Sequence, residues 1–294
     1  MTIKGLFRRP GDPVTVINEG DKMKIKIGTS GYSFPDWKGP VYPAEIKKED
    51  MLRFYQDKLG FHTVELNYTY YTLPAQKSIA GIMKKTGPDF DFSVKAYREM
   101  THGVIDKERG DIIDNKEVFE KFKFSLKPLR DENKLSCVLA QFPYSFHCTR
   151  PAKRYLEIFR DLMGGIPVVA EFRNAGWHNE ETIDLLKRLN MGYCVVDEPQ
   201  LPGLMPFCPA VSSSIGYFRF HGRNKNWFGG SVSERYNYFY NKNELEQFVP
   251  PIKEVVGKTK ETLVFFNNCH AGSAARNAVQ LARMLDAEFQ GIVL

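Results

Sequence analysis

The stretch Ile166-Pro-Val-Val-Ala-Glu171-Phe-Arg173-Asn-Ala-Gly-Trp177 changes from apolar to polar within a few residues. Residues 167–170 are apolar and mostly β-branched, which is typical of a strand covered on both faces by helices. The carboxylate of Glu171, the guanidinium of Arg173 and the indole of Trp177 follow at the end of that strand. Because such groups are costly to bury without partners, we expect them to line a cleft there.

The same transition recurs along the chain. Eight strands with polar ends are predicted, over residues 25–32 (including a glycine turn), 63–67, 91–96, 135–143, 167–170, 192–198, 215–223 and 262–268. Helices are predicted over about 44–59, over about 150–163 and near 180–190. One further helix begins at about 75, one ends at about 130, one begins at about 243, and the last follows the loop at 269–273. The proline-rich segment 199–214 is predicted to be irregular.

Alternating strands and helices favour a parallel sheet, because parallel neighbours need a crossover connection. Eight such units over about 270 residues predict a single (β/α)₈ TIM-like barrel, with an open doubly wound parallel sheet as the alternative. The first strand is not followed by G-x-G-x-x-G, so dinucleotide binding lacks its usual signal.

The 294-residue composition, with 43% hydrophobic and 26% charged residues, is ordinary for a globular protein with one large core. Residues 1–23 are expected to be an extension, and residues 24–294 the barrel domain.

The five cysteines form no C-x-x-C pair, and no apolar run reaches membrane-spanning length, so we expect a cytoplasmic protein without a disulfide framework. The formal net charge of +6 permits an acidic partner such as nucleic acid without requiring one. Cofactors and oligomeric state are not indicated.

In a barrel the carboxyl ends of all strands share one rim, where such proteins place their chemistry. All three tryptophans and five of the six histidines fall at or after predicted strand ends, which favours a site on this rim. The candidates for acid–base chemistry are Glu65, Lys95, Glu171, Asp197 and His221. The candidates for substrate binding are Tyr32, Trp37, Asn67, His102, Gln141, Arg173, Trp177, Arg219, Arg223, Trp227, Asn267 and Asn268.

The basic strand ends predict an anionic ligand. Arg173, Arg219, Arg223 and Lys95 supply donors, and the loop 268–273 opens a helix whose free N–H groups suit a phosphate. The competing interpretation for each arginine is an ion pair with a rim carboxylate. The aromatic residues suit stacking on a ring, or alternatively packing that closes the rim. The loop 222–242 is a candidate lid.

Two further chemistries stay open. Glu65, Glu171, Asp197 and His221, with Asn268, suit a divalent metal, although neighbouring arginines would compete with the cation. A pair of carboxylates would also suit glycoside hydrolysis.

The chain resembles the YecE-like family, the domain of unknown function numbered 72, over about residues 25–287. The motifs that carry the resemblance are Gly28-Thr-Ser-Gly-Tyr32, Trp37, Tyr42-Pro43, Glu65-Leu-Asn67-Tyr-Thr-Tyr-Tyr71, Lys95, Thr101-His102, Gln141-Phe-Pro143, Glu171-Phe-Arg173, Trp177, Asp197-Glu198, Arg219-Phe-His221-Gly-Arg223, Trp227 and Phe266-Asn-Asn268. The resemblance implies a barrel fold and says little about the reaction.

We therefore expect an enzyme, a hydrolase or lyase, that performs acid–base chemistry on an anionic substrate such as a phosphorylated compound. The alternatives are a metal-dependent phosphodiester hydrolase acting on nucleic acid, and a binding module without turnover that holds an anion or a single strand.

Overall fold

The computed structural model describes residues 25–106, 108–229, 232–285 and 291–292. The predicted extension over residues 1–23 lies outside the described residues. Within them, no helix is both long enough and apolar enough to cross a membrane. All five cysteines are described and carry free thiols, as expected from their spacing.

Eight parallel strands form the centre of the molecule. They are β1 (Ile25–Thr29), β2 (Thr63–Leu66), β3 (Asp91–Lys95), β4 (Leu135–Gln141), β5 (Val168–Glu171), β6 (Gly192–Asp197), β7 (Ile215–Phe220) and β8 (Glu261–Phe266). Their spatial order follows the sequence, and β1 pairs with β8. A bridge between Ser30 and Glu65 links the ends of β1 and β2, with Gly31 N donating to the Glu65 carbonyl at 2.9 Å. The barrel prediction is confirmed, and the doubly wound alternative is wrong.

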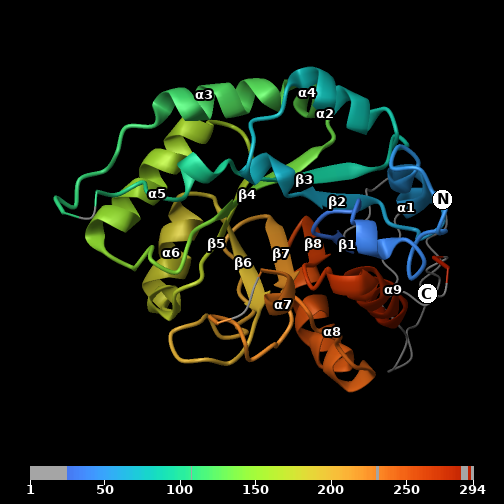
Figure 1. The fold of residues 1–294 in the computed structure, drawn as a ribbon. Coiled ribbons are helices and arrows are strands. Elements are labelled where there is room, and N and C mark those ends of the chain that lie inside the picture. The colour runs from blue at the N-terminus through green and yellow to red at the C-terminus, as the bar shows by residue number, and fades with distance from the viewer. Residues whose placement is uncertain (1–24, 107, 230–231, 286–290, 293–294) are drawn as a thin grey trace, which may run out of the picture.

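Helices surround this barrel (Figure 1). They are α1 (Met51–Asp57), α2 (Gln76–Met83), α3 (Lys116–Ser125), α4 (Lys127–Asp131), α5 (Arg150–Met163), α6 (Glu180–Arg188), α7 (Val232–Arg235), α8 (Lys242–Val256) and α9 (Ser273–Leu285). Short 3₁₀ turns follow several strands, over Pro35–Trp37, Tyr68–Tyr70, Arg98–Met100, Ala175–Trp177 and His270–Gly272. The segment 199–214 has no helix, as predicted.

The first predicted helix is shorter than expected. Residues 44–50 form turns, and all but Ile46 are exposed, whereas Met51, Leu52 and Tyr55 are buried. A helical segment without an apolar face to bury gains little from tertiary packing. The helix therefore begins only where its side chains contact the barrel.

The two ends of the barrel interior carry different charge networks. At the amino ends of the strands, Lys26 pairs with Asp91 and lies 2.9 Å from a carboxylate oxygen of Glu261. All four residues of β5 are buried, so the change from Ala170 to Glu171 occurs inside the molecule. The second network begins at Glu171 and lies near the carboxyl ends of the strands.

Candidate functional site at the carboxyl ends of the strands

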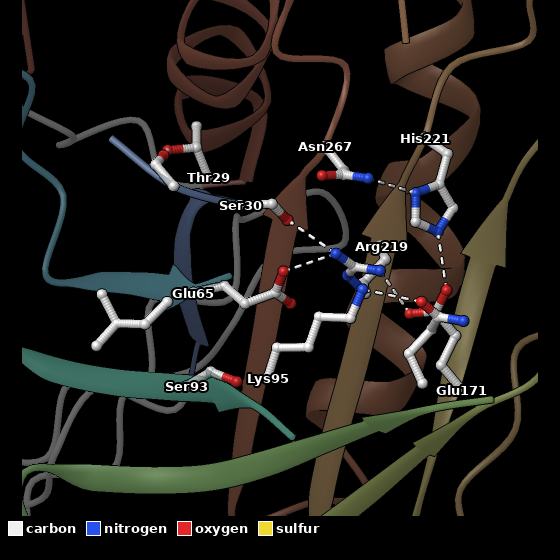
Figure 2. A network of polar contacts seen from close by, with 12 residues as sticks. Thr29, Ser30, Glu65, Ser93, Lys95, Glu171, Arg219, His221 and Asn267 are labelled. Atoms are coloured by element: carbon white, nitrogen blue, oxygen red, sulfur yellow. Dashed lines mark hydrogen bonds and ion pairs between the residues drawn. The ribbon is translucent and has the colours of Figure 1, made fainter. Parts of the chain in front are cut away.

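A buried arginine joins two strands across the barrel interior. Nη2 of Arg219 donates to Oε1 of Glu65 at 2.6 Å, and Nη1 donates to Oε2 of Glu171 at 2.6 Å (Figure 2). Nη2 also lies 3.3 Å from Oγ of Ser30. Arg219 is 1% exposed and both glutamates are fully buried. Each donor–acceptor pair is charge-assisted and short, so this arginine is fixed in place.

Glu65 has a second partner on β7. Tyr217 donates its hydroxyl to Oε2 of Glu65 at 2.6 Å, and Oγ of Ser93 lies 2.7 Å from the same hydroxyl. Tyr217 and Arg219 are two residues apart, so both side chains point to the same side of the strand. Both carboxylate oxygens of Glu65 are therefore occupied by side chains of β7.

A second arginine extends the network beyond β5. Nε of Arg173 lies 2.7 Å from Oε1 of Glu171, an ion pair without the alignment of a hydrogen bond, and Nη1 donates to Oε2 of Glu198 at 2.9 Å. Oε1 of Glu198 accepts from the backbone N–H of Met205 at 3.0 Å. The Arg173 side chain is 11% exposed. Nη2 of Arg173 has no hydrogen-bond partner among the described residues, which leaves a donor for a ligand.

Burial and neighbouring charges separate the pKa values of two carboxyl groups. Burial alone raises the pKa of Glu171, but the guanidiniums of Arg173 and Arg219 hold it well below its usual value. Burial raises the pKa of Glu198 to about 7, against the opposing effect of Arg173. Glu171 is thus ionised at neutral pH, whereas Glu198 titrates near neutrality.

His221 is a neutral member of the network. Its Nδ1 lies 3.0 Å from the amide nitrogen of Asn267, and its Nε2 lies 3.3 Å from Oε1 of Glu171. Burial, followed by the charge of Arg173, lowers the pKa of His221 well below its usual value. If the Asn267 amide donates to Nδ1, the proton of the neutral ring is on Nε2 and faces Glu171.

Lys95 approaches the network from β3 (Figure 2). Its Nζ donates to Oε1 of Gln141 at 2.9 Å and lies 4.4 Å from the centre of the Tyr70 ring. Within the described part of the chain, no carboxylate lies within ion-pair distance of this amine. Burial, followed by repulsion from Arg219, lowers the pKa of Lys95 to about 7. The residue as a whole is partly exposed.

The predicted cluster is largely assembled, but two of its members lie elsewhere. The buried Asp197 accepts from Arg223 at 2.7–3.1 Å and from the Tyr240 hydroxyl at 2.6 Å. Tyr240 packs on Phe220 of β7 and on α8, outside the barrel interior. Asn268 bonds to Asn277 of α9 and to the Tyr238 carbonyl. The proposed metal set of Glu65, Glu171, Asp197, His221 and Asn268 is therefore not brought together, and the described residues contain no group of three or more His, Cys, Asp or Glu arranged to hold a metal ion.

The predicted phosphate position after β8 contains a carboxylate of the chain itself. Oδ2 of Asp36 accepts from the backbone N–H of Ala271 at 2.7 Å. Ala271 has φ 47°, a left-handed conformation at the kink where the 3₁₀ turn meets α9. An anion at this helix opening would have to displace Asp36.

The aromatic candidates divide between packing and the rim. Trp37 is buried and donates to the Cys269 carbonyl at 2.7 Å, and the buried Trp177 donates to the Phe146 carbonyl at 2.6 Å and stacks on Phe172. Both therefore pack the loops against the barrel. Trp227 is also buried, but its ring lies 5.6 Å from the Arg173 guanidinium.

The remaining candidates lie on the rim and are partly exposed. These are Tyr32, Asn67, His102, Gln141, Arg223 and Asn267. His102 lies 5.1 Å from Tyr70, ring centre to ring centre, and burial together with the charge of Lys95 lowers its pKa to about 4. Oδ1 of Asn67 is buried without a hydrogen-bond partner among the described residues.

Sequence reasoning did not single out Ser30, Ser93, Glu198 or Tyr217 as site residues. The signal for Tyr217 was its spacing of two from Arg219 and four from His221, which places all three on one side of a strand. Glu198 stands beside Asp197 in the sequence, and nothing in the local pattern favours one over the other.

Comparison with known proteins shows the family and the fold of the chain. A family model described as "Protein of unknown function DUF72" matches residues 26–294. The chain belongs to this family. UPF0759 protein YunF of Bacillus subtilis is 36% identical over 282 residues, covering 91% of this chain and 97% of that protein.

Solved structures of DUF72 family proteins share the barrel. One from Thermotoga maritima has a TM-score of 0.83 and 44% identity, covering 90% of this chain and 99% of that one. One from Enterococcus faecalis has a TM-score of 0.77 and 28% identity, covering 89% and 95% of the respective chains. The resemblance inferred from the motifs is thereby confirmed.

We predict that Asp197 anchors the loop after β7. Asp197→Ala should destabilise the protein by about 1–3 kcal/mol, because the Tyr240 hydroxyl loses its buried acceptor. Urea denaturation measures this loss. Asp197→Asn keeps an acceptor oxygen and should leave the titration of Lys95 near pH 7 unchanged. A displaced titration in that variant would instead couple Asp197 to the site.

Proposed function

We propose that this DUF72 protein is an enzyme that binds an anionic substrate at the carboxyl ends of the strands and transfers a proton through the amine of Lys95. The proposal is supported by a difference in burial between the acidic and the basic side chains of the site. Glu65, Glu171 and Glu198 are fully buried, whereas Lys95 and Arg173 are partly exposed. An approaching ligand therefore meets N–H donors before it meets carboxylates.

The donors on this rim suit a carboxylate or a phosphate. Arg173 keeps Nη2 available, Lys95 adds an ammonium group when protonated, and the amides of Gln141 and Asn267 are also partly exposed. Guanidinium and ammonium groups are the usual partners of such anions. Arg173 and Lys95 are therefore the first candidates for binding the anionic group of the substrate.

Lys95 is the best candidate for the group that accepts the proton. A general base is most effective when its pKa lies near the working pH, and the pKa of Lys95 is lowered to about 7. Glu171 is a weaker candidate because its low pKa makes it a poor base. Both oxygens of Glu65 are already bonded.

The buried ion pairs then have a positioning role. Arg219 is fixed by two glutamates, and its charge contributes to the lowered pKa of Lys95. Proton abstraction beside an electron-withdrawing group is a step common to lyases and to some hydrolases. The predicted acid–base chemistry is thus retained, with Lys95 in place of the carboxylates as the reacting group.

Competitive labelling with acetic anhydride across pH 5–11, read by mass spectrometry, tests this function. We expect half-maximal reactivity of Lys95 near pH 7, and the exposed Lys121 serves as the reference within the same chain. Inorganic phosphate should protect Lys95, whereas sodium chloride at equal ionic strength should not. Arg173→Met should weaken this protection about ten-fold or more.

Two outcomes would contradict the proposal. One is a Lys95 that titrates together with Lys121. The other is a Lys95 that titrates near pH 7 but gains no protection from phosphate at millimolar concentration. Phosphate protection that requires an added divalent metal would instead favour the phosphodiester hydrolase.

A further inference from the structure

The surroundings of Lys95 are unusual for an amine that serves only as a base or an ion-pair partner. Its Nζ has one neutral acceptor, Oε1 of Gln141, and an aromatic ring at 4.4 Å. Most buried ammonium groups are paired with a carboxylate. Lys26 at the opposite end of the barrel is paired in that way, with Asp91 and Glu261. Lys95 has no such carboxylate partner among the described residues, although Glu65 and Glu171 belong to the adjoining network.

The carboxylates near Lys95 are held by other cations. Glu65 and Glu171 are bound by Arg219, and Glu171 is also bound by Arg173. These contacts keep the glutamates from forming the ion pair that would hold Lys95 protonated. The fixed positive charge of Arg219 acts in the same direction. A neutral lysine amine beside another cation is a common way to prepare a nucleophile for carbonyl addition.

We propose that Lys95 forms an imine with the aldehyde or ketone carbonyl of a substrate that also carries a carboxylate or phosphate group. This inference rests on the proposed function, because the same rim must bind the anionic group. The anion would contact Arg173, whose Nη2 has no hydrogen-bond partner among the described residues. The carbonyl carbon would then lie against Nζ of Lys95.

The step balances without any external oxidant or reductant. The lone pair of Nζ forms a bond to the carbonyl carbon, and the carbonyl oxygen takes up a proton to give a carbinolamine. The nitrogen releases a proton, the hydroxyl group leaves as water after protonation, and the C=N bond forms. The product is an iminium cation, which withdraws electrons from the adjacent carbon and so promotes loss of a proton or cleavage of a carbon–carbon bond there.

Glu171 and Glu65 favour a cation at Lys95, against burial and the charge of Arg219. Among the paired groups, two guanidiniums contact three carboxylates, so this set carries one net negative charge when Glu198 is ionised. His221 stays neutral beside Glu171 and does not offset that charge. His102, the titratable group beyond Tyr70, is also neutral near pH 7. Neither histidine therefore adds a positive charge that would oppose an iminium at Lys95.

Reductive trapping tests the inference on the full-length protein. Glyoxylate, an oxo acid, and acetaldehyde, an uncharged aldehyde, are each added with sodium cyanoborohydride, and the adducts are mapped by mass spectrometry. We expect glyoxylate to label Lys95 at least ten-fold faster than Lys121, and acetaldehyde to show much less preference. Inorganic phosphate should slow the labelling of Lys95, and Lys95→Arg should lose the adduct while circular dichroism shows an intact fold.

The outcomes separate this inference from the proposed function. Labelling of Lys95 no faster than that of Lys121 overturns the imine. If acetic anhydride still shows an amine that titrates near pH 7 and is protected by phosphate, the acid–base proposal stands alone. A Lys95 that titrates normally overturns both. Equal selectivity for glyoxylate and acetaldehyde overturns the assignment of an anionic carbonyl substrate.

Discussion

Arg219→Ala is expected to destabilise the protein by about 3–5 kcal/mol, because it leaves the buried Glu65 without its cation and Glu171 with Arg173 alone. The guanidinium bonds Glu65 and Glu171 at 2.6 Å each and is 1% exposed, so water cannot readily take its place. Urea denaturation at pH 7, followed by circular dichroism, measures the loss. Arg219→Lys should recover only part of it, because an ammonium group lacks the planar fork that reaches both glutamates.

The control is an exposed ion pair. Arg154→Ala removes a partner of Glu157 on the surface of α5 and should change the free energy of unfolding by less than about 0.5 kcal/mol. A triple variant with Arg219→Met, Glu65→Gln and Glu171→Gln should be more stable than Arg219→Ala, because it removes the buried charges together. A loss below about 1 kcal/mol in Arg219→Ala would contradict the structural role of this arginine.

Acid should reduce the difference between wild type and Arg219→Ala. The pKa of Glu171 is lowered in the folded protein, so its pairing stabilises the fold above the unfolded pKa of about 4.5. That contribution is lost as the pH falls through the lower, folded pKa. The variant lacks Arg219 and keeps only Arg173 beside Glu171, so its stability should depend less on pH in this acidic range.

The fold was predictable because its signal is repeated. Each strand is an apolar run that ends in polar residues, and eight repeats in sequence order leave few topologies besides the barrel. Helix α5 runs from Arg150 to Met163, as the pattern predicts. The helix predicted over 44–59 was too long, because its first seven residues carry helix-compatible side chains but bury almost none of them. Local sequence does not show which face contacts the barrel.

The site was predictable at the level of the rim but not of single side chains. Strands covered on both faces are apolar throughout, so the alternation that would distinguish Asp197 from Glu198 is not visible in Gly192-Tyr-Cys-Val-Val. A shift of one residue exchanges the inside and outside of a strand. The structure directs Glu198 to Arg173 and Asp197 to Arg223, a choice that depends on strand register and tilt.

Charge pairing was the other unknown. The sequence supplies Arg173, Arg219 and Arg223 on the rim, and either a ligand or a carboxylate of the chain can satisfy each of them. The structure pairs all three with buried carboxylates and leaves Lys95 without one among the described residues. The proposed site is therefore centred on Lys95, a rim cation without an ionic partner among the described residues, and this property depends on distances that only a structure provides.

Lys95→Met is expected to stabilise the protein at pH 6. The pKa of Lys95 falls from 10.5 in the unfolded chain to about 7 in the fold, so below pH 7 the fold holds a proton on a desolvated amine. Between about pH 7 and 10.5 the unfolded state binds the extra proton, and the stability of the wild type therefore rises with pH. A pKa difference of this size corresponds to at most about 5 kcal/mol, and partial exposure of the residue reduces the expected gain to about 2 kcal/mol.

Urea denaturation of both proteins between pH 6 and 10 measures the effect. The advantage of Lys95→Met should be largest at pH 6 and should shrink as the pH rises toward 10.5, whereas Lys121→Met, on an exposed helix surface, should show no such trend. A variant less stable than wild type at pH 6, or a difference that does not change with pH, would contradict the lowered pKa. A destabilising amine is retained in a fold chiefly where it is needed for activity. A more stable Lys95→Met protein, together with selective labelling of Lys95 by glyoxylate in the wild type, would therefore link the stability cost of this lysine to its chemistry.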